Sequence, residues 1–364
     1  MRYTSIGNKL HTRYINTLYI NGGNIVIEVS HLTKRYGAHT AVADLSFTVE
    51  SGQIYGLLGP NGAGKSTTMN IITGCLASTE GTVRIGGFDI FEQPREAKSL
   101  IGYLPEQPPV YLDMTPLEYL NFVGRAKGVK KAELAEQVRS AMEVTQIAEM
   151  QNRLIRNLSK GYRQRVGIAQ ALLGQPEVII LDEPTVGLDP LQIIEIRDLI
   201  RELGRNHTVI LSSHILSEVR AICHKVLIIA KGKLVACDTP EALEKLFATG
   251  ATLSLTVKGD RAAIEGVLTP LELKSFTVQP EQDGLCAVDM EALVGTADAL
   301  AERVFFAFCD AKLPILRMQS AQPSLEDVFI ELTSHTPTGP TPDGEAETDD
   351  SPAEETDEKE ADAQ

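Results

Sequence analysis

Cysteine is scarce in this sequence and forms no metal-binding pattern. The five cysteines are odd in number, widely spaced and free of Cys-x-x-Cys pairs. That pattern argues against a disulfide framework and against a cysteine-based zinc site. They fit reduced thiols in a cytosolic compartment: Cys75, Cys223, Cys237, Cys286 and Cys309.

Long hydrophobic runs are also absent. No stretch approaches the ~18 consecutive apolar residues that a membrane-spanning helix requires. The mildly basic start of the chain is interrupted by polar residues before it can form the apolar run of about 7–15 residues that a secretory signal needs. We therefore expect a chain that neither crosses a bilayer nor carries a secretory signal.

Basic residues do not outnumber acidic residues in this sequence. The net charge is −15, and residues 341–364 hold eleven acidic residues against one lysine, which leaves −10 in this segment and −5 in the rest of the chain. Without a basic footprint, we expect no nucleic-acid partner. Residues 334–364 also contain too few apolar residues to offset the entropy of ordering, so we predict a disordered acidic tail.

What is present is an ordinary globular composition. The 364 residues are 43% hydrophobic and 23% charged, which predicts two or three folded domains. Residues 1–24 show no clear period and are interpreted as an N-terminal extension. Over residues 25–245, short apolar strands alternate with helices, the pattern of an α/β fold with a largely parallel sheet.

A second unit is predicted over residues 250–333. Its expected order is β-α-β-β-α-β, the split-βαβ arrangement of ferredoxin-like α+β domains, and a last helix is expected to open at Ser324. The expected strands are 252–258, 273–279, 285–290 and 314–319, and the expected helices are 261–268 and 296–310.

The most informative segment is a glycine-rich loop between an apolar strand and a helix. Its spacing is that of a P-loop, in which backbone N–H groups cradle phosphate oxygens at the start of a helix. Lys65 would reach the β- and γ-phosphates, and the Ser66 hydroxyl would ligate Mg²⁺. The loop consists of Gly59, Pro60, Asn61, Gly62, Ala63, Gly64, Lys65, Ser66 and Thr67.

A pair of acidic residues follows the apolar run 178–181. A strand can simply end in solvated acids, but a P-loop in the same chain favours a catalytic interpretation. Asp182 suits the magnesium shell, and Glu183 suits a base that orients the attacking water.

Segment 158–165 reads Leu-Ser-Lys-Gly-Tyr-Arg-Gln-Arg, with Ser159 placed 23 residues ahead of Asp182. It resembles the signature of ABC-transporter ATPases, Leu-Ser-Gly-Gly-Gln, from which Lys160 and Tyr162 depart. Taken alone, the segment is typical of a helix start capped by Ser159. The resemblance implies that Leu158, Ser159 and Gly161 act on a nucleotide bound by another chain.

Other positions follow the order of that family. The resemblance implies that Tyr36 stacks on adenine, that Asp189 belongs to the D-loop, and that His214 contacts the γ-phosphate. Asp189 also suits the N-cap of a helix, and both interpretations can hold together. Glu106 aligns with the magnesium-binding glutamine, while Gln107 lies one residue later, and the sequence leaves open which of them reaches the metal.

Over residues 25–240 the resemblance implies a P-loop NTPase core with an antiparallel β subdomain and a helical subdomain at about 107–165. Such proteins bind ATP and Mg²⁺ and pair head to tail, as a homodimer or with a second ATPase subunit. The C-terminal unit resembles that of the ABC-2 exporter group. The implied function is ATP hydrolysis that drives a separate membrane permease, with the chain peripheral at the cytoplasmic face of the cell membrane.

Two other function classes fit less well. A soluble ABC-type ATPase that acts on ribosomes would carry two tandem cassettes. One that acts on DNA ends would have a long coiled coil between its P-loop and its signature, whereas Ser159 lies only 94 positions after Lys65 here. A nucleotide-gated regulatory or immunity module would not need Glu183 and His214. The transported substrate cannot be predicted from these residues, because the permease contacts it.

Overall fold

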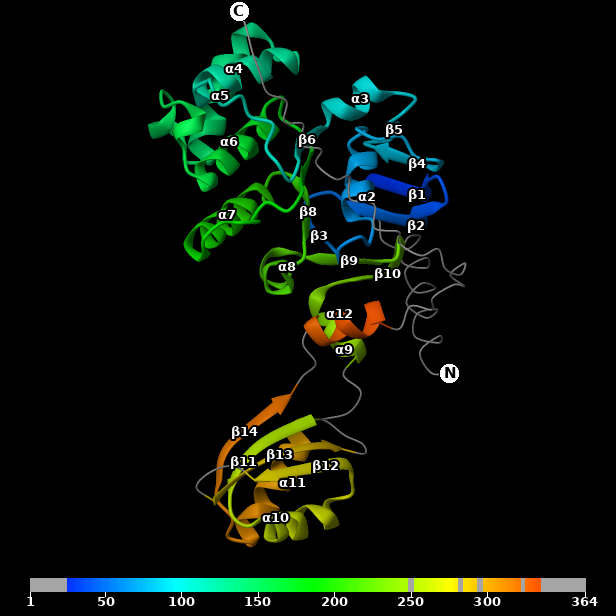
Figure 1. Cartoon of the computed structure of the whole chain (residues 1–364), viewed down its shortest axis with the longest axis vertical. Helices are drawn as coiled ribbons and strands as arrows, with labels where there is room; N and C mark the ends of the chain where they lie inside the picture. Colours follow the sequence, from blue (N-terminus) through cyan, green and yellow to red (C-terminus); the bar gives the residue numbers. More distant parts are fainter. Residues whose placement is uncertain (1–24, 248–251, 281–283, 293–296, 322–324, 335–364) are drawn as a thin grey trace, which may run out of the picture.

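The computed structural model describes residues 25–247, 252–280, 284–292, 297–321 and 325–334. The predictions for the N-terminal extension and the acidic tail beyond Ser334 lie outside these ranges, as does Ser324. Within them, the strands form three sheets (Figure 1).

The central sheet has the strand order β10-β9-β3-β8-β7-β6, and all neighbours are parallel except β10 and β9. Strands β3, β7 and β8 are buried along their whole length, as expected where both faces of a parallel sheet are covered. Parallel pairing brings their carboxyl ends to one edge. The bounds are Ile54–Leu58 for β3, Ile101–Leu104 for β6, Val178–Leu181 for β7, Thr208–Ser213 for β8, Lys225–Ala230 for β9 and Lys233–Asp238 for β10.

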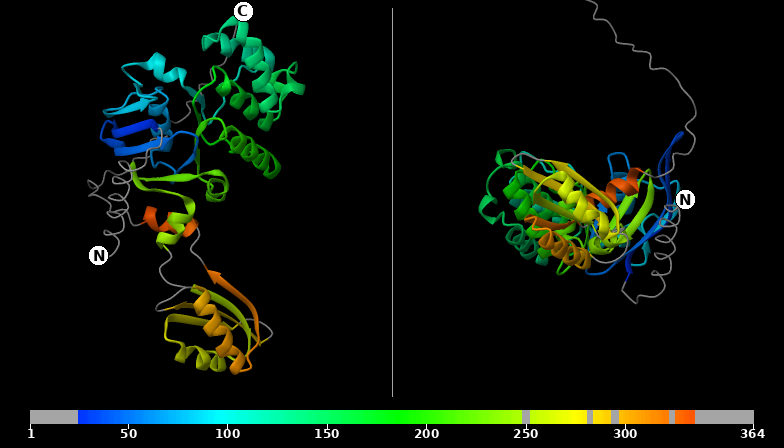
Figure 2. Two further views of the ribbon diagram at one scale, coloured as in Figure 1. Left: turned by 180° about the vertical axis from the view of Figure 1, so that it is seen from behind. Right: turned by 90° about the horizontal axis from the view of Figure 1, so that it is seen from below.

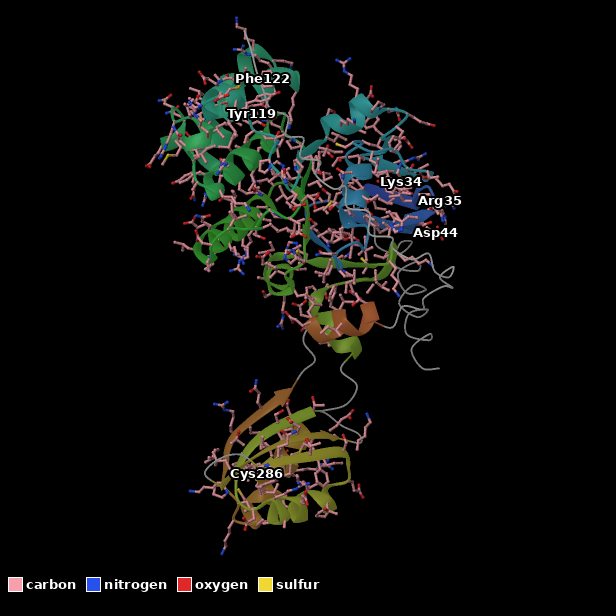
Figure 3. All side chains as sticks on the ribbon, viewed as in Figure 1. Lys34, Arg35, Asp44, Tyr119, Phe122 and Cys286 are labelled. Atoms are coloured by element: carbon pink, nitrogen blue, oxygen red, sulfur yellow. The ribbon has the colours of Figure 1, made fainter. Side chains whose placement is uncertain are left out.

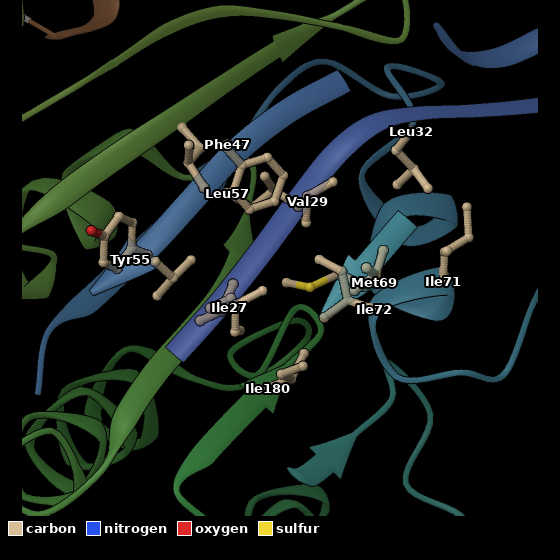
Figure 4. Packing of buried hydrophobic residues seen from close by; sticks show 14 of the residues in the cluster. Ile27, Val29, Leu32, Phe47, Tyr55, Leu57, Met69, Ile71, Ile72 and Ile180 are labelled. Carbon is tan, nitrogen blue, oxygen red and sulfur yellow. The ribbon is translucent and has the colours of Figure 1, made fainter. Parts of the chain in front are cut away.

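An antiparallel sheet of order β2-β1-β4-β5 packs beside the central sheet. Helix α2 lies between them, and one apolar core includes Ile27 and Phe47 from the antiparallel sheet, Met69 from α2 and Ile180 from β7 (Figure 4). The bounds are Ile25–Tyr36 for β1, His39–Glu50 for β2, Lys65–Ile72 for α2, Glu80–Ile85 for β4, Phe88–Asp89 for β5 and Pro94–Ser99 for α3.

Helices α4, α5 and α6 form a helical subdomain with its own apolar core. Tyr119 is buried in that core, whereas Phe122, also on α4, is exposed (Figure 3). The Lys127 ammonium donates to three backbone carbonyls at the end of α6, at 3.0 to 3.2 Å, and so joins α4 to α6. The bounds are Pro116–Ala126 for α4, Lys131–Val144 for α5, Lys160–Leu172 for α6, Pro190–Leu203 for α7, Leu216–Ile222 for α8 and Pro240–Phe247 for α9.

The third sheet has the antiparallel order β12-β13-β11-β14. Together with α10 and α11 it confirms the predicted β-α-β-β-α-β arrangement, and its apolar core includes Val257, Val288 and Val304. The bounds are Thr252–Lys258 for β11, Arg261–Leu268 for α10, Leu273–Pro280 for β12, Leu285–Ala292 for β13, Ala297–Asp310 for α11 and Ile315–Ala321 for β14.

The last described helix, α12 (Leu325–Ser334), packs on the domain that contains the central sheet. Leu325 and Val328 belong to the same apolar cluster as Leu243 of α9 and Val226 of β9. Figure 2 shows α12 beside α9 and separate from the sheet β11–β14. The unit predicted over residues 250–333 therefore includes a helix whose buried face belongs to the core of the preceding domain.

We expect Val328→Ala to destabilise the central domain. Val328 is 0% exposed, so truncation should lower the free energy of unfolding by about 1–3 kcal/mol. Ile330→Ala is the matched control, because Ile330 is on the same helix and 61% exposed. Circular dichroism during denaturation measures the effect, and ATP identifies the relevant transition by raising its midpoint. An ATP-shifted transition that Val328→Ala leaves unchanged would contradict this packing.

Among the described residues, no helix is both long enough and apolar enough to cross a membrane.

Candidate functional site

The glycine-rich loop joins β3 to α2, as predicted. Two of its glycines are required by close backbone contacts: a Cβ at Gly59 would lie 2.3 Å from the carbonyl oxygen of Ile229, and one at Gly64 would lie 2.5 Å from that of Ala41. Gly64 also has φ 102°, a conformation that residues with a side chain rarely adopt. The loop therefore packs closely against the backbone at Ile229 and at Ala41, which leaves no room for a side chain at either glycine.

Lys65 is the first residue of α2 and is folded back under the loop. Its Nζ donates to the carbonyl oxygen of Gly59 at 2.7 Å and to that of Pro60 at 3.3 Å. Burial lowers the pKa of Lys65, while the nearby Glu183 and Asp182 carboxylates oppose that shift. The loop thus holds a cation close to the two acids that follow β7.

Asp182 and Glu183 are held by one hydroxyl of the neighbouring strand. Ser212 Oγ donates to Asp182 Oδ1 at 2.5 Å and accepts from the Glu183 backbone N–H at 2.8 Å. The parallel register of β7 and β8, with Leu181 opposite Leu211, brings these groups together. Ser212 is a residue that the sequence reasoning missed.

Glu183 and His214 form a hydrogen-bonded pair. His214 Nδ1 lies 2.8 Å from Glu183 Oε2, with 52% of the histidine side chain and 12% of the glutamate side chain exposed. Because an ionised carboxylate only accepts hydrogen bonds, Nδ1 carries a hydrogen in this contact and Nε2 is left for another partner.

A cleft of about 560 Å³ brings most of the predicted nucleotide-binding residues together, but Gly59, Pro60 and the buried Asp182 are not among the residues that line it. Tyr36, the P-loop, Glu183 and His214 share it, and of the two alternatives at positions 106 and 107 only Glu106 lines it. The lining residues are Tyr36, His39, Ala41, Asn61, Gly62, Ala63, Gly64, Lys65, Ser66, Thr67, Glu106, Glu183, Val186 and His214. His39, Ala41 and Val186 carry no local signal that could have identified them from the sequence.

The signature segment is not among the residues that line this cleft. Ser159 caps α6, and its side chain accepts from the Tyr162 N–H at 3.3 Å. Asp189 caps α7 and accepts from the Gln192 N–H at 3.0 Å. A Cβ at Gly161 would lie 2.5 Å from Gln192 Oε1, so the signature and the D-loop segment are in close contact.

Comparison with known proteins identifies the family. Residues 42–186 match the family described as ABC transporter. Over 309 residues the chain is 34% identical to the bacitracin transport ATP-binding protein BcrA of Bacillus licheniformis, covering 84% of this chain and 97% of that protein. The chain belongs to the ABC transporter ATP-binding proteins. As a member of this family it has the P-loop NTPase fold and is an ATPase.

Two further relatives of this ABC ATPase bear on its function. The Nod factor export ATP-binding protein I of Paraburkholderia xenovorans (strain LB400) is 36% identical over 308 residues, which cover 84% of this chain and 96% of that protein. The dimeric structure of a bacterial ABC transporter cassette has a TM-score of 0.53 and 25% identity, over 58% of this chain and 98% of that structure.

Proposed function

We propose that this ABC ATPase is the energy-supplying subunit of an exporter, working with a separate permease at the cytoplasmic face of the membrane. The observation that carries the proposal is the single cleft shared by Tyr36, the P-loop, Glu106, Glu183 and His214. Two relatives are named for bacitracin transport and for Nod factor export. These names support a role in transport, and the second supports transport out of the cell.

In this proposal the cleft binds ATP with the triphosphate over the start of α2. Backbone N–H groups of the loop and the positive end of the helix hold the phosphates. Lys65, already close to the loop carbonyls, exchanges those contacts for the β- and γ-phosphate oxygens. Tyr36, which is half exposed at the end of β1, offers its ring to the adenine.

The oxygen donors around the phosphate end suit Mg²⁺, which prefers oxygen ligands. We assign the Ser66 hydroxyl and the Asp182 carboxylate to this ion. Of the two alternatives for the third ligand we assign Glu106, because it lines the cleft with Ser66 whereas Gln107 does not. Asp182 does not line the cleft either, but it directly precedes Glu183, which does. When bound, Mg²⁺ neutralises phosphate charge during transfer.

Glu183 is the proposed general base, and His214 its partner. The Glu183 carboxylate would accept a proton from the water that attacks the γ-phosphate. His214 holds that carboxylate through Nδ1 and keeps Nε2 for a γ-phosphate oxygen. Both side chains line the cleft, so neither has to move from another part of the chain to reach the nucleotide.

We propose that the active site is completed by a second subunit. At the start of α6 Ser159 is exposed and Gly161 is buried, and neither lines the cleft of its own chain. A helix start with no acidic residue in its first turn suits a phosphate group. In a head-to-tail pair, supported by the dimeric relative, Leu158, Ser159 and Gly161 would close over the partner's ATP.

We assign permease contact to an aromatic patch on the helical subdomain, formed by Tyr111, Leu112 and Phe122. Each is about half exposed, and the rings of Tyr111 and Phe122 are 5.5 Å apart. The segment between β6 and α4 contains both Glu106 of the cleft and Tyr111 of the patch. A permease bound there would sense the nucleotide through this one segment.

Co-purification from membranes tests the exporter proposal. We expect the parent chain to recover one polytopic membrane protein and Phe122→Glu to recover several-fold less, since a charge in the patch is costly to bury. Phe306→Glu is the matched control, because Phe306 is an exposed aromatic residue on α11. Equal recovery with Phe122→Glu would contradict the assigned patch, and a parent chain that recovers ribosomes instead would contradict the exporter.

A further inference from the structure

Glu218, on α8, is a buried carboxyl group that does not line the cleft. It is 4% exposed, and its Oε2 accepts hydrogen bonds from Thr185 Oγ1 at 2.7 Å and from Ser213 Oγ at 3.3 Å. Among the described residues, Oε1 has no hydrogen-bond partner. Burying a carboxyl group with an unpaired oxygen is costly, so this placement calls for a functional explanation.

Both hydroxyl partners are close in sequence to the groups assigned to catalysis. Thr185 follows Glu183 by two residues, and Ser213 immediately precedes His214. Ser213 Oγ accepts from the Ile215 N–H at 3.0 Å, which leaves its single hydrogen for Glu218. Glu218 therefore bridges the segment after β7 and the last residue of β8.

The backbone at Glu183 needs support of this kind. Glu183 has φ 48°, in the left-handed region that residues other than glycine adopt only where their surroundings hold them. On its amino side the backbone N–H of Glu183 is bonded to Ser212 Oγ. On its carboxyl side the corresponding side-chain anchor is the bond from Thr185 to Glu218.

We propose that Glu218 is a positioning residue that fixes Glu183 against His214 through Thr185 and Ser213. This inference rests on the proposed roles of Glu183 and His214. Glu218 does not contact the nucleotide, so its loss should impair turnover without impairing ATP binding. The bond from His214 Nδ1 to Glu183 Oε2, at 2.8 Å, is the contact that depends on this bridge.

Replacing Glu218 tests the bridge, because loss of positioning should lower kcat and leave KM for ATP nearly unchanged. Glu218→Met keeps side-chain length but removes the acceptor, and we expect kcat to fall about tenfold while KM for ATP stays within about twofold. Glu218→Gln should keep most of the turnover, because its amide oxygen can still accept from Thr185. Thr185→Val removes the hydroxyl that donates to Glu218 and should lower kcat by a similar factor.

Glu244→Met is the matched control for loss of a buried carboxyl group that anchors the same helix. Glu244 is 8% exposed and pairs with Arg220 of α8 at 3.1 Å, but it is on α9. We expect this variant to leave kcat within about twofold of the parent. A fall in kcat as large as that of Glu218→Met would mean that loosening α8 is sufficient, and would overturn the proposal.

A coupled variant separates positioning from general stability. In a His214→Ala background, Glu218→Met should reduce turnover little further, because the contact it maintains is already lost. If the fold reductions in turnover caused by His214→Ala and by Glu218→Met multiplied in the double variant, the proposal would be overturned. If Glu183→Gln kept parental turnover, the proposed site and this inference would fall together. An inactive Glu183→Gln with a fully active Glu218→Met would overturn this inference alone.

Discussion

Replacing Glu183 with glutamine should lower the rate of ATP hydrolysis by ~10²-fold or more while ATP binding persists. The amide keeps the shape of the side chain and can still bond to His214, which lies 2.8 Å away, but it lacks the charge that polarises water. Steady-state phosphate release and equilibrium nucleotide binding, measured on the same preparation, separate the two effects.

Two further variants make the expected result specific. Glu177→Gln should keep the parental rate, because Glu177 is exposed at the opposite end of β7. Lys65→Ala should instead weaken nucleotide binding itself, since the side chain beside the loop carbonyls is lost. Hydrolysis by Glu183→Gln at the rate of the parent would refute the assignment of the base.

The parts of the site that could be predicted from the sequence are those whose geometry is local. The P-loop depends on the order of residues 59–67 and on the strand and helix that flank it, so spacing alone identifies it. Ser159 and Asp189 were likewise predicted as caps, and both accept the expected backbone hydrogen bond. The β-α-β-β-α-β order of the C-terminal unit followed from alternation along the chain.

The remaining features depend on contacts between distant segments. Ser212 reaches Asp182 because β7 and β8 are parallel neighbours in a specific register, which no local pattern specifies. The choice between Glu106 and Gln107 depends on which side chain faces the cleft. The helix over 325–334 is amphipathic in sequence, but its pattern does not show which apolar core covers it.

The position of the signature segment predicts an active site that is shared between two chains. Lys65 lines the cleft, whereas Ser159 does not line the cleft of its own chain. If each active site combines Lys65 of one chain with Ser159 and Gly161 of the other, then Lys65→Ala and Ser159→Arg damage opposite halves of a site. Each variant alone should be nearly inactive, because both sites of its dimer carry the lesion.

A mixture of the two variants should recover ATP-dependent dimer formation. In a mixed dimer, the Lys65→Ala chain still supplies an intact Ser159, and the Ser159→Arg chain still supplies an intact Lys65, so one complete site forms and the other carries both lesions. Inactivity of each separate variant is equally compatible with sites built within one chain, and therefore only the mixture discriminates. Size-exclusion chromatography with ATP, in a Glu183→Gln background that prevents turnover, reports the dimer without the permease. If subunits exchange and the mixture stays monomeric where parental chains dimerise, the composite site must be abandoned for this protein.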